Sequence, residues 1–316
     1  MENYPRTLAE FESRFSSERA CLEYLFQLRW PDGFVCPHCG YKKGWQISDM
    51  MLECASCSYQ CSVTAGTIFH RTRLPLQTWF RAIWWVTSQK TGASALGLQH
   101  ILGLGSYRTA WSWLHKLRRA MVRPGRERLS GTIEMDETYV GGEKEGKRGR
   151  GAAGKSLVVI ATEINQKRIG RIRLCRVDNA SANNLGVAAQ ESIELGAVIH
   201  TDGWLGYNRL GSLGYIHEIV RDDGEIGENL LPSCHRVAAL LKRWLLGTHQ
   251  GAVSHEHLDY YLDEFTFRFN RRTSRHRGKL FLRLLENAME IEPVTYKELS
   301  KGIRGRKPGN TTGCGT

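Results

Sequence analysis

The apolar positions in the first third of the chain recur with the spacing of helices. Residues 76–89 carry a stripe of large apolar side chains, formed by Trp79, Phe80, Trp84, Trp85 and Val86. A second, short helix is predicted over residues 93–102, where it is ended by a glycine. Ser106 is a preferred N-cap residue and predicts a third helix over residues 107–121. The pattern therefore predicts a helical segment over residues 71–125.

From residue 129 onward the apolar pattern changes to that of β-strands. The predicted strands cover residues 131–140, 157–164, 169–177, 197–200 and 217–220. Helices are predicted over residues 180–195, between the third and fourth strands, and over residues 234–246. Three strands, a helix, a strand and later helices form the succession of an RNase-H-like fold. We therefore predict an α/β domain over residues 126–295.

The charge of the chain adds a partner to this picture. Lys and Arg total 44 against 32 Asp and Glu, which gives a formal net charge of +12 and a sequence pI of about 9.4. Such a surplus favours a polyanionic partner, and nucleic acid is the usual one. A basic enzyme that does not bind nucleic acid is the alternative.

The sequence shows no feature of a membrane protein. No apolar run approaches the roughly 18 to 20 residues that span a bilayer. The first twelve residues are polar and unlike a signal peptide. We therefore expect a cytoplasmic protein that associates with the nucleoid and not with a membrane.

Four of the nine cysteines form two C-x-x-C pairs. The pairs read CPHC at residues 36–39 and CASC at residues 54–57, in a C-x2-C-x14-C-x2-C frame. This spacing is typical of a zinc ribbon, because two tight turns can each supply two thiolates to one tetrahedral ion. Gly40 provides the positive φ that such a turn tends to require. We predict a structural Zn²⁺ ion in a ribbon over residues 31–70, after a helical lead over residues 1–30. The ligands are Cys36, Cys39, Cys54 and Cys57.

Two nearby residues are expected not to ligate this ion. Cys61 is expected to be buried and His38 to face solvent, because structural zinc sites are closed at four ligands. A pair of redox dithiols is the alternative interpretation of the cysteines.

The predicted helix over residues 107–121 is basic. A helix, a glycine-containing turn and a basic helix form the outline of a DNA-binding helix-turn-helix. The first turn of a recognition helix usually touches base edges, and Arg108 lies there. The candidate DNA contacts are Arg108, Lys116, Arg118 and Arg119. The alternative is a helix pair that only packs, since many such pairs never meet DNA.

Two aspartates stand at related places in the predicted sheet. Asp136 lies in the first strand, and Asp202 lies just past the end of the fourth. These strands are neighbours in an RNase-H-like sheet, so their carboxylates would face one another near one end of it. Two close carboxylates repel unless a cation lies between them, and Mg²⁺ or Mn²⁺ suits such oxygen ligands. Alternatively, Asp202 serves the geometry of an Asp-Gly turn and Asp136 forms part of a charged edge.

Three strings resemble a known family. MDETYVGG at residues 135–142, HTDGWLGY at 200–207 and the long string at 235–272 are similar to bacterial insertion-sequence transposases of the zinc-ribbon, ISXO-like group. This resemblance extends over nearly the whole chain. It implies an RNase-H-like DDE catalytic domain that depends on Mg²⁺ or Mn²⁺, and it implies cleavage and joining of transposon-end and target DNA. It also implies a homo-oligomer on paired ends.

Carried over residue by residue, the resemblance assigns four catalytic positions. Asp136 and Asp202 match the first and second family aspartates, Lys242 matches a family lysine, and His235 stands seven residues before that lysine. Most DDE enzymes have Glu at this third position, but the group includes members with His. The three matched ligands of magnesium would be Asp136, Asp202 and His235.

The substitution leaves the third ligand open. A neutral imidazole can bind a metal but brings no negative charge. Seven residues span two helical turns, so His235 and Lys242 share a face. Competing acids are Glu225, Glu228, Asp263 and Glu264. Glu134, two residues before Asp136, shares its strand face and either assists a metal or serves the structure.

Basic stretches supply further candidate DNA contacts. Residues 263–272 alternate aromatic residues with arginines, of which Arg271 and Arg272 are expected to meet phosphates. Residues 143–155 are rich in Gly, Lys and Arg and are expected to be a mobile arm that becomes ordered on DNA. Residues 296–316 are expected to be a basic, flexible tail.

Three functions compete on this evidence. The first is a transposase that cleaves transposon ends and transfers strands to target DNA. The second is a non-catalytic zinc-ribbon DNA-binding protein or an inactivated transposase, which would have no need of the aspartate pair. The third is an RNase-H-like nuclease without strand-joining activity.

Overall fold

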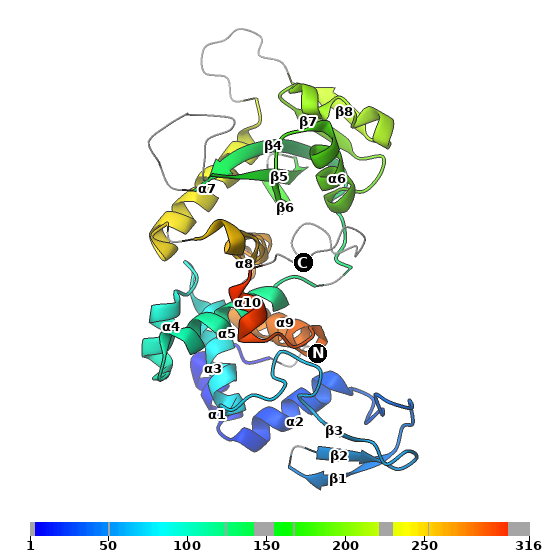
Figure 1. Cartoon of the computed structure of the whole chain (residues 1–316), viewed down its shortest axis with the longest axis vertical. Coiled ribbons are helices and arrows are strands. Elements are labelled where there is room, and N and C mark those ends of the chain that lie inside the picture. The colour runs from blue at the N-terminus through cyan, green and yellow to red at the C-terminus, as the bar shows by residue number, and fades with distance from the viewer. Residues whose placement is uncertain are drawn as a thin grey trace. The chain divides into compact units, whose positions relative to one another are not determined.

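The computed structural model of the chain describes residues 4–49, 51–123, 125–141, 155–166, 168–220, 230–251 and 253–302 (Figure 1). Contacts divide the chain into two compact units. The N-terminal unit comprises residues 1–121 and 274–300, and the sheet unit comprises residues 122–273 and 301–316. No helix in the described ranges has the length and apolar character needed to cross a bilayer.

The N-terminal unit combines a small sheet with helices from both ends of the chain. Its strands β1 (Gly44–Ser48), β2 (Met51–Cys54) and β3 (Gln60–Ser62) form an antiparallel sheet in that order. Its helices are α1 (Leu8–Arg14), α2 (Glu18–Arg29), α3 (Leu76–Ser88), α4 (Ala95–Leu102), α5 (Tyr107–Ala120), α9 (Arg277–Glu290) and α10 (Tyr296–Ser300). The three predicted helices of the segment over residues 71–125 are thus confirmed as α3, α4 and α5, with ends shifted by a residue or two.

Helix α2 ties the small sheet to the helices. At its C-terminal end, Arg29 donates hydrogen bonds to the carbonyls of Val63 and Ala65, both 2.6 Å, in the loop after β3. At its N-terminal end, the Glu18 carboxylate accepts from the backbone amides of Leu76 and Gln77. These amides begin α3, which has no side-chain cap of its own because Pro75 occupies its N-cap position. One helix therefore fixes two elements that lie far away in the sequence.

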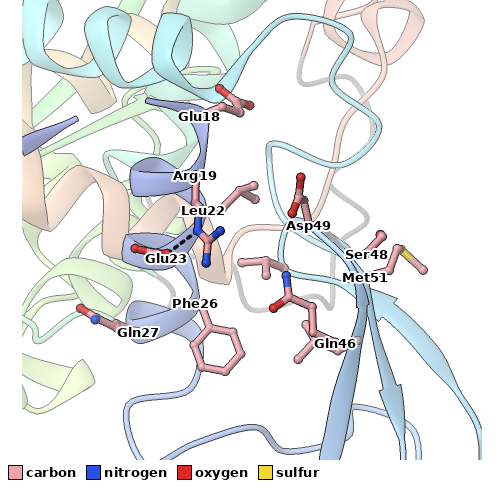
Figure 2. A pocket seen from close by; sticks show the side chains of 12 residues that line it. Glu18, Arg19, Leu22, Glu23, Phe26, Gln27, Gln46, Ser48, Asp49 and Met51 are labelled. Atoms are coloured by element: carbon pink, nitrogen blue, oxygen red, sulfur yellow. Dashed lines mark hydrogen bonds and ion pairs between the residues drawn. The ribbon is translucent and has the colours of Figure 1, made fainter. Parts of the chain in front are cut away.

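A cavity of about 460 Å³ opens between α2 and the first two ribbon strands (Figure 2). Its lining includes the apolar side chains of Leu22, Phe26 and Met51. Acidic residues also line it, and one of them, Glu23, pairs with Arg19 at 2.9 Å. Negative charge at this cavity does not suit a phosphate backbone.

Helix α9 differs from expectation in the unit to which it belongs. We predicted that residues 126–295 form one domain, but α9 packs against α3, α5 and α2 in the N-terminal unit. The reason is Phe281, which is fully buried and contacts the rings of Phe11, Phe80 and Trp84. The amphipathic helix therefore completes an aromatic core built by residues more than 190 positions earlier.

The end of the described chain also differs from the expected flexible tail. Residues 296–300 form α10, whose Tyr296 contacts Trp111 of α5. The rest of the expected tail from residue 303, and the expected arm at residues 143–155 apart from Lys155, lie outside the described residues.

The sheet unit contains a five-stranded sheet in the order β6-β5-β4-β7-β8. Its strands are β4 (Thr132–Val140), β5 (Ser156–Asn165), β6 (Arg168–Val177), β7 (Val198–Thr201) and β8 (Ile216–Ile219). Strands β4, β5 and β6 pair antiparallel, whereas β7 runs parallel to β4 and β8 parallel to β7. This order and these directions confirm the RNase-H-like fold.

Helices lie against both faces of this sheet (Figure 1). They are α6 (Ala182–Ser192), α7 (Pro232–His249) and α8 (Leu258–Asn270), with short 3₁₀ turns at Leu205–Tyr207, Gly211–Leu213 and His255–His257. Met135 of β4 packs into a core with Leu185 and Ala189 of α6. Its neighbour Glu134 instead bonds to α7. Because side chains alternate along a strand, α6 and α7 cover opposite faces.

Candidate active site and metal centres

The register of two parallel strands places Asp136 level with Asp202. Strand β4 pairs with β7 so that Ile133 lies opposite Ile199 and Glu134 opposite His200. Continuing this register by two residues sets position 136 beside position 202, and neighbouring strands lie about 4.8 Å apart. Asp202 follows the end of β7. Positions 136 and 202 therefore lie side by side at one end of the sheet, where the sequence leads us to expect a shared cation site.

A tight turn holds Asp202 at this end of the sheet. The Oδ1 atom of Asp202 accepts a hydrogen bond from the Trp204 amide at 2.9 Å, and Thr201 Oγ1 accepts from the Gly203 amide at 3.2 Å. Gly203 has a φ of +81°, and a Cβ there would lie 2.7 Å from the Ile219 side chain. Only glycine fits this turn without strain. Asp202 therefore both stabilises the Asp-Gly turn and carries its carboxylate at the end of the sheet.

The pKa of Asp136 is affected by burial and by the nearby charge of Asp202. Burial raises the pKa of the Asp136 carboxyl to about 6, and the charges of Glu137 and Asp202 add to the increase. The Glu137 amide, which donates to Asp136 Oδ1 at 2.8 Å, and the charge of His235 act in the opposite direction. A partly buried carboxylate beside other carboxylates is costly to ionise, and a divalent cation would remove that cost.

Helix α7 brings the third predicted residue to the same place. His235 lies in the first turn of α7, and its Nε2 is 3.3 Å from Asp136 Oδ2. The imidazole is 52% exposed, whereas the Asp136 side chain is 17% exposed. Lys242 lies two turns further along α7 and is exposed. Burial and the charge of Lys155 lower the pKa of Lys242, and the charge of Asp136 opposes that decrease.

Glu134 secures the start of α7. Its buried Oε2 accepts hydrogen bonds from the amides of Ser233 at 2.8 Å and Cys234 at 3.0 Å. These are first-turn amides of α7, which have no partner within the helix, and a carboxylate there also suits the helix dipole. His235 is the next residue. This contact favours the structural interpretation of Glu134, as a residue that positions His235 against Asp136.

The sequence did not predict a second contact that holds β4 in place next to Asp136. It lies on the other face of the strand and involves Tyr207. The Tyr207 hydroxyl donates a 2.6 Å hydrogen bond to Glu137 Oε2, and Tyr207 is fully buried. Burial and the neighbouring Glu137 raise the pKa of Tyr207 well above its usual value, so the hydroxyl keeps its proton. The signal available in the sequence was a tyrosine five residues after Asp202, within the HTDGWLGY string.

The competing acids do not displace His235 in the described part of the chain. Asp263 and Glu264 are buried in α8, which packs on β6, and Glu264 pairs with Arg268 at 2.8 Å. Glu225 and Glu228 lie outside the described residues.

The four cysteines predicted to bind zinc form a much tighter group. Cys36 Sγ lies 3.7 Å from Cys57 Sγ, and Cys39 Sγ lies 3.6 Å from Cys54 Sγ. Sulfurs bound at 2.3 Å to one tetrahedral ion are about 3.8 Å apart, so this cluster fits Zn²⁺. Among the described residues, these four cysteines are the one set of three or more potential ligands whose ligand atoms all lie within 4.8 Å of one another. Asp136, Asp202 and His235 therefore form a more open group.

Matching turns build the two halves of the cysteine cluster. The amide of Gly40 donates to the Cys36 carbonyl, and the amide of Ser58 donates to the Cys54 carbonyl. Both residues have positive φ, +74° for Gly40 and +53° for Ser58. The sequence predicted the first of these but not the second, which is not a glycine. Cys61 is buried outside the cluster, and His38 is exposed and stacks on the ring of Tyr59.

Two family models match the chain, one in each part described above. The model of the ISXO2-like transposase domain matches residues 128–270, and the model of the transposase zinc-ribbon domain matches residues 16–60. The first match spans the sheet and helices α6 to α8, and the second spans the cysteine cluster.

The chain therefore contains an ISXO2-like transposase domain and a transposase zinc-ribbon domain.

One curated relative is similar over most of the transposase. It is described as an uncharacterized protein in transposable element ISH50 of Halobacterium salinarum. The two are 26% identical over 298 residues, which make up 87% of this chain and 98% of the relative.

Two solved structures also resemble the transposase. The catalytic core of BIV integrase is 16% identical, with a TM-score of 0.32, over 49% of this chain and 95% of that one. A simian T-cell lymphotropic virus intasome, solved with the PP2A regulatory subunit B56 gamma, is 13% identical, with a TM-score of 0.30, over 58% of this chain and 70% of that one.

The transposase is a DDE-type phosphoryl-transfer enzyme, and its family implies a divalent metal at the carboxylate site and zinc at the cysteines. The donor set fits that expectation. A partly buried carboxylate with a raised pKa and a second carboxylate level with it are oxygen ligands that suit a hard divalent cation, and the His235 imidazole nitrogen lies 3.3 Å from the first.

The predicted DNA contacts of α5 differ in their exposure. Arg108 is exposed and lies over the Tyr296 ring, 3.7 Å from its centroid. Lys116 and Arg119 are partly buried, and Lys116 lies over the Trp79 ring. Arg118 is only 2% exposed, so its assignment to DNA was wrong. It falls on the buried face of α5, because it lies one turn from Leu114 and packs inward with it.

The two predicted arginines at the end of α8 turn back onto their own helix. The Arg271 guanidinium lies over the Phe267 ring and that of Arg272 over the Phe269 ring, each 4.1 Å from the centroid. Arg272 is exposed and also donates to the carbonyls of Ile169 and Gly170 at the start of β6. These contacts hold the charge of Arg272 at a defined place on the surface.

Proposed function

We propose that the cleavage and joining reactions of this transposase take place at Asp136, Asp202 and His235, which would hold Mg²⁺ or Mn²⁺. The observation that carries the proposal is the convergence of three elements. The β4–β7 register sets Asp136 beside Asp202, and the first turn of α7 places His235 Nε2 3.3 Å from Asp136.

The reaction is an in-line substitution at phosphorus, performed twice. In the first, a water oxygen attacks the phosphorus at the transposon end, and the 3′ oxygen of the neighbouring nucleotide leaves and takes up a proton. In the second, that 3′-hydroxyl attacks a phosphorus of the target DNA, and a target 3′ oxygen leaves. Bound divalent ions supply positive charge to the attacking and leaving oxygens of such reactions.

The residues of the chain hold and align the reacting groups. Asp136 and Asp202 supply the negative charge of the cation site, and His235 supplies a neutral nitrogen. Lys242 shares the exposed face of α7 with His235, two turns away, and would contact a phosphate next to the one that reacts. Glu134 fixes the helix that carries both residues.

The other predicted roles extend this proposal to binding. The zinc ribbon and helices α4 and α5 would read transposon-end DNA, with Arg108 in the first turn of α5 as the foremost candidate contact. Paired ends would require at least two copies of the chain. The division that we propose is a DNA-reading N-terminal unit completed by α9 and α10, and a catalytic sheet unit.

The test uses duplex oligonucleotides made from the DNA that flanks the coding sequence. With Mg²⁺ or Mn²⁺, the full chain should nick them at one position and join the ends to a plasmid. Asp136→Asn and Asp202→Asn should each abolish both reactions while DNA binding is retained. Asp178→Asn, an exposed aspartate after β6, is the matched control and should remain active.

Two outcomes would overturn the assignment. Undiminished cleavage by Asp136→Asn would place the reaction elsewhere. Cleavage without joining of pre-cut ends would leave a nuclease in place of a strand-transfer enzyme.

A further inference from the structure

The sheet unit contains a second basic feature, apart from the carboxylate site. A cavity of about 620 Å³ lies where the end of β5, the start of β6, the first turns of α7 and the end of α8 meet. Four arginines line it: Arg168, Arg171, Arg236 and Arg272. No acidic residue is among the lining residues.

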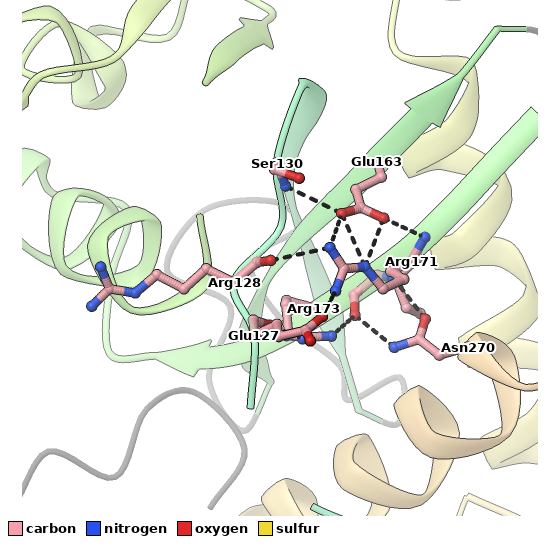
Figure 3. Close-up of polar contacts among 8 residues, drawn as sticks. Glu127, Arg128, Ser130, Glu163, Arg171, Arg173 and Asn270 are labelled. Carbon is pink, nitrogen blue, oxygen red and sulfur yellow. Dashed lines mark hydrogen bonds and ion pairs between the residues drawn. The ribbon is translucent and has the colours of Figure 1, made fainter. Parts of the chain in front are cut away.

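The four guanidinium groups are not equivalent. Arg171 is neutralised, because it forms ion pairs with Glu163 at 2.6 Å and Glu127 at 3.1 Å (Figure 3). Among the described residues, the acceptors of Arg272 are neutral: the carbonyls of Ile169, Gly170 and Phe269. Arg168 and Arg236 are exposed, and no carboxylate pairs with either of them in the described part of the chain. Three positive charges therefore share one cavity, and no carboxylate from the described ranges pairs with them.

The walls of the cavity are held in place by contacts that do not use these three charges. Asn270 exchanges two hydrogen bonds with the backbone of Ile172, at 2.8 and 3.1 Å, and so joins the end of α8 to β6 (Figure 3). Glu163 accepts from the Ser130 amide and from Arg171, which joins β5 to the start of β4 and to β6. A rigid, preorganised set of donors binds an anion with little loss of entropy.

The position of Arg236 relates this cavity to the reaction site. Arg236 directly follows His235 in α7, so the two side chains point about 100° apart around the same helical turn. Leu240, one turn on, also lines the cavity. A DNA strand whose phosphate lies beside His235 would pass this next face of α7.

We propose that the cavity formed by Arg168, Arg236 and Arg272 binds a backbone phosphate of the DNA strand that enters the reaction site. A planar guanidinium matches the oxygens of a phosphodiester and can donate two hydrogen bonds to it. A phosphate would also relieve the mutual repulsion of the three arginines. The site acts on the backbone and is independent of base sequence. The proposal rests on the proposed function for the identity of the strand, but not for the existence of the anion site.

The first experiment measures DNA binding without cleavage. It uses fluorescence anisotropy of a labelled duplex with the Asp136→Asn chain, over a series of salt concentrations. Arg168→Gln and Arg236→Gln, added to that background, should each weaken binding and lower the slope of log affinity against log salt by about 0.9 for each lost phosphate contact. Both side chains are exposed, so the variants should keep the fold. Arg209→Gln, an exposed arginine outside the cavity, removes the same charge and should leave the slope unchanged.

The second experiment locates the contact. Single methylphosphonates, which lack the phosphate charge, are placed one by one along the duplex. At one position the neutral linkage should weaken binding by the chain with Arg236 but have no further effect with Arg236→Gln. If Arg168→Gln and Arg236→Gln behave like Arg209→Gln in both experiments, the site does not exist.

Free anions provide the last distinction. Inorganic phosphate, added without DNA, should raise the melting temperature slightly in the parent chain and less in Arg236→Gln. If it does so while the methylphosphonate pattern is unchanged by Arg236→Gln, the cavity binds free phosphate and the assignment to DNA is wrong. If the arginine variants behave as expected but Asp136→Asn still cleaves, the phosphate site stands and the proposed catalytic site fails.

Discussion

The cysteine cluster and the proposed carboxylate site of the transposase are assembled in opposite ways. The cysteine cluster comes from two short turns within one small sheet, and its sulfurs lie 3.6 and 3.7 Å apart across the site. The proposed carboxylate site comes from three elements more than 30 residues apart, and its candidate ligands form a more open, partly exposed group. A closed, local set of four ligands suits an ion that holds a fold together, whereas an open, non-local set leaves positions for a substrate. We therefore expect the loss of zinc to unfold the ribbon, and the loss of the other cation to stop catalysis without unfolding the protein.

The largest expected effect is the loss of the ribbon without zinc. Cys54→Ser should abolish stoichiometric zinc binding and unfold β1 to β3, because the binding energy of a structural zinc ion is folding energy. Zinc content and hydrogen exchange in residues 31–62 would measure this. Cys61→Ser, also buried but outside the cluster, should keep one zinc per chain. Equal loss of zinc in both variants would break the proposed distinction between ligand and neighbour.

Removal of the catalytic cation should have the contrasting result. A brief treatment with a weak chelator should stop cleavage completely and reversibly while the far-ultraviolet circular dichroism stays unchanged. The reason is that an open, half-exposed site exchanges its ion with solvent, whereas four thiolates hold theirs. Unfolding that accompanies the loss of activity would contradict the comparison.

A third test concerns Glu134, which accepts hydrogen bonds from the first-turn amides of α7 next to His235. Glu134→Gln should lower the cleavage rate roughly 10- to 100-fold, the usual cost of losing a residue that orients a metal ligand. Mn²⁺ affinity should fall with it, because the first turn of α7 would no longer be fixed against β4. Glu163→Gln changes another buried carboxylate of the same sheet, and it should lower stability without changing Mn²⁺ affinity. If the Glu134→Gln variant binds Mn²⁺ as tightly as the parent does, Glu134 does not position His235.

Histidine at position 235 brings no negative charge to the cation site, and this allows a fourth test. His235→Glu adds a carboxylate where most DDE enzymes have one, so Mg²⁺ should bind about 10-fold more tightly. Calorimetric titration would measure the change. His276→Glu in the N-terminal unit alters charge equally and should have no effect. An unchanged affinity in His235→Glu would exclude position 235 from the ligand set.

The last test concerns a pH-dependent gain in stability. In the absence of divalent ions the pKa of Asp136 is raised from 3.8 to about 6, so folding disfavours its charged form. That cost is fully present above pH 6 and disappears as the pH falls toward 3.8. Asp136→Asn should therefore stabilise the metal-free protein by up to about 3 kcal/mol at pH 7.5. The gain should shrink by pH 4.5, and thermal unfolding at both pH values would measure it. A gain that does not depend on pH would show that Asp136 does not titrate in this range.

The sequence alone determined the local features of this protein. The C-x-x-C spacing identified all four members of the cysteine cluster, because each pair lies in one turn and needs no information from elsewhere. Apolar-rich runs placed all five strands to within a residue or two, and the neighbouring positions of two of them in an RNase-H-like sheet predicted that positions 136 and 202 lie side by side. Helical periodicity likewise located α3, α4 and α5.

Only the tertiary structure decided the features that depend on partners distant in the sequence. Periodicity cannot tell which of two cores a helix joins, and α9 left the expected catalytic domain because Phe281 fills an aromatic core at the other end of the chain. Charge composition cannot tell an exposed arginine from a buried one, and so it misassigned Arg118. The bond from Glu134 to α7 and the cavity shared by Arg168, Arg236 and Arg272 join segments about 30 to 100 residues apart. A pattern read along the chain specifies local backbone conformation, but the electrostatic environment of a side chain is set by whatever the fold packs beside it.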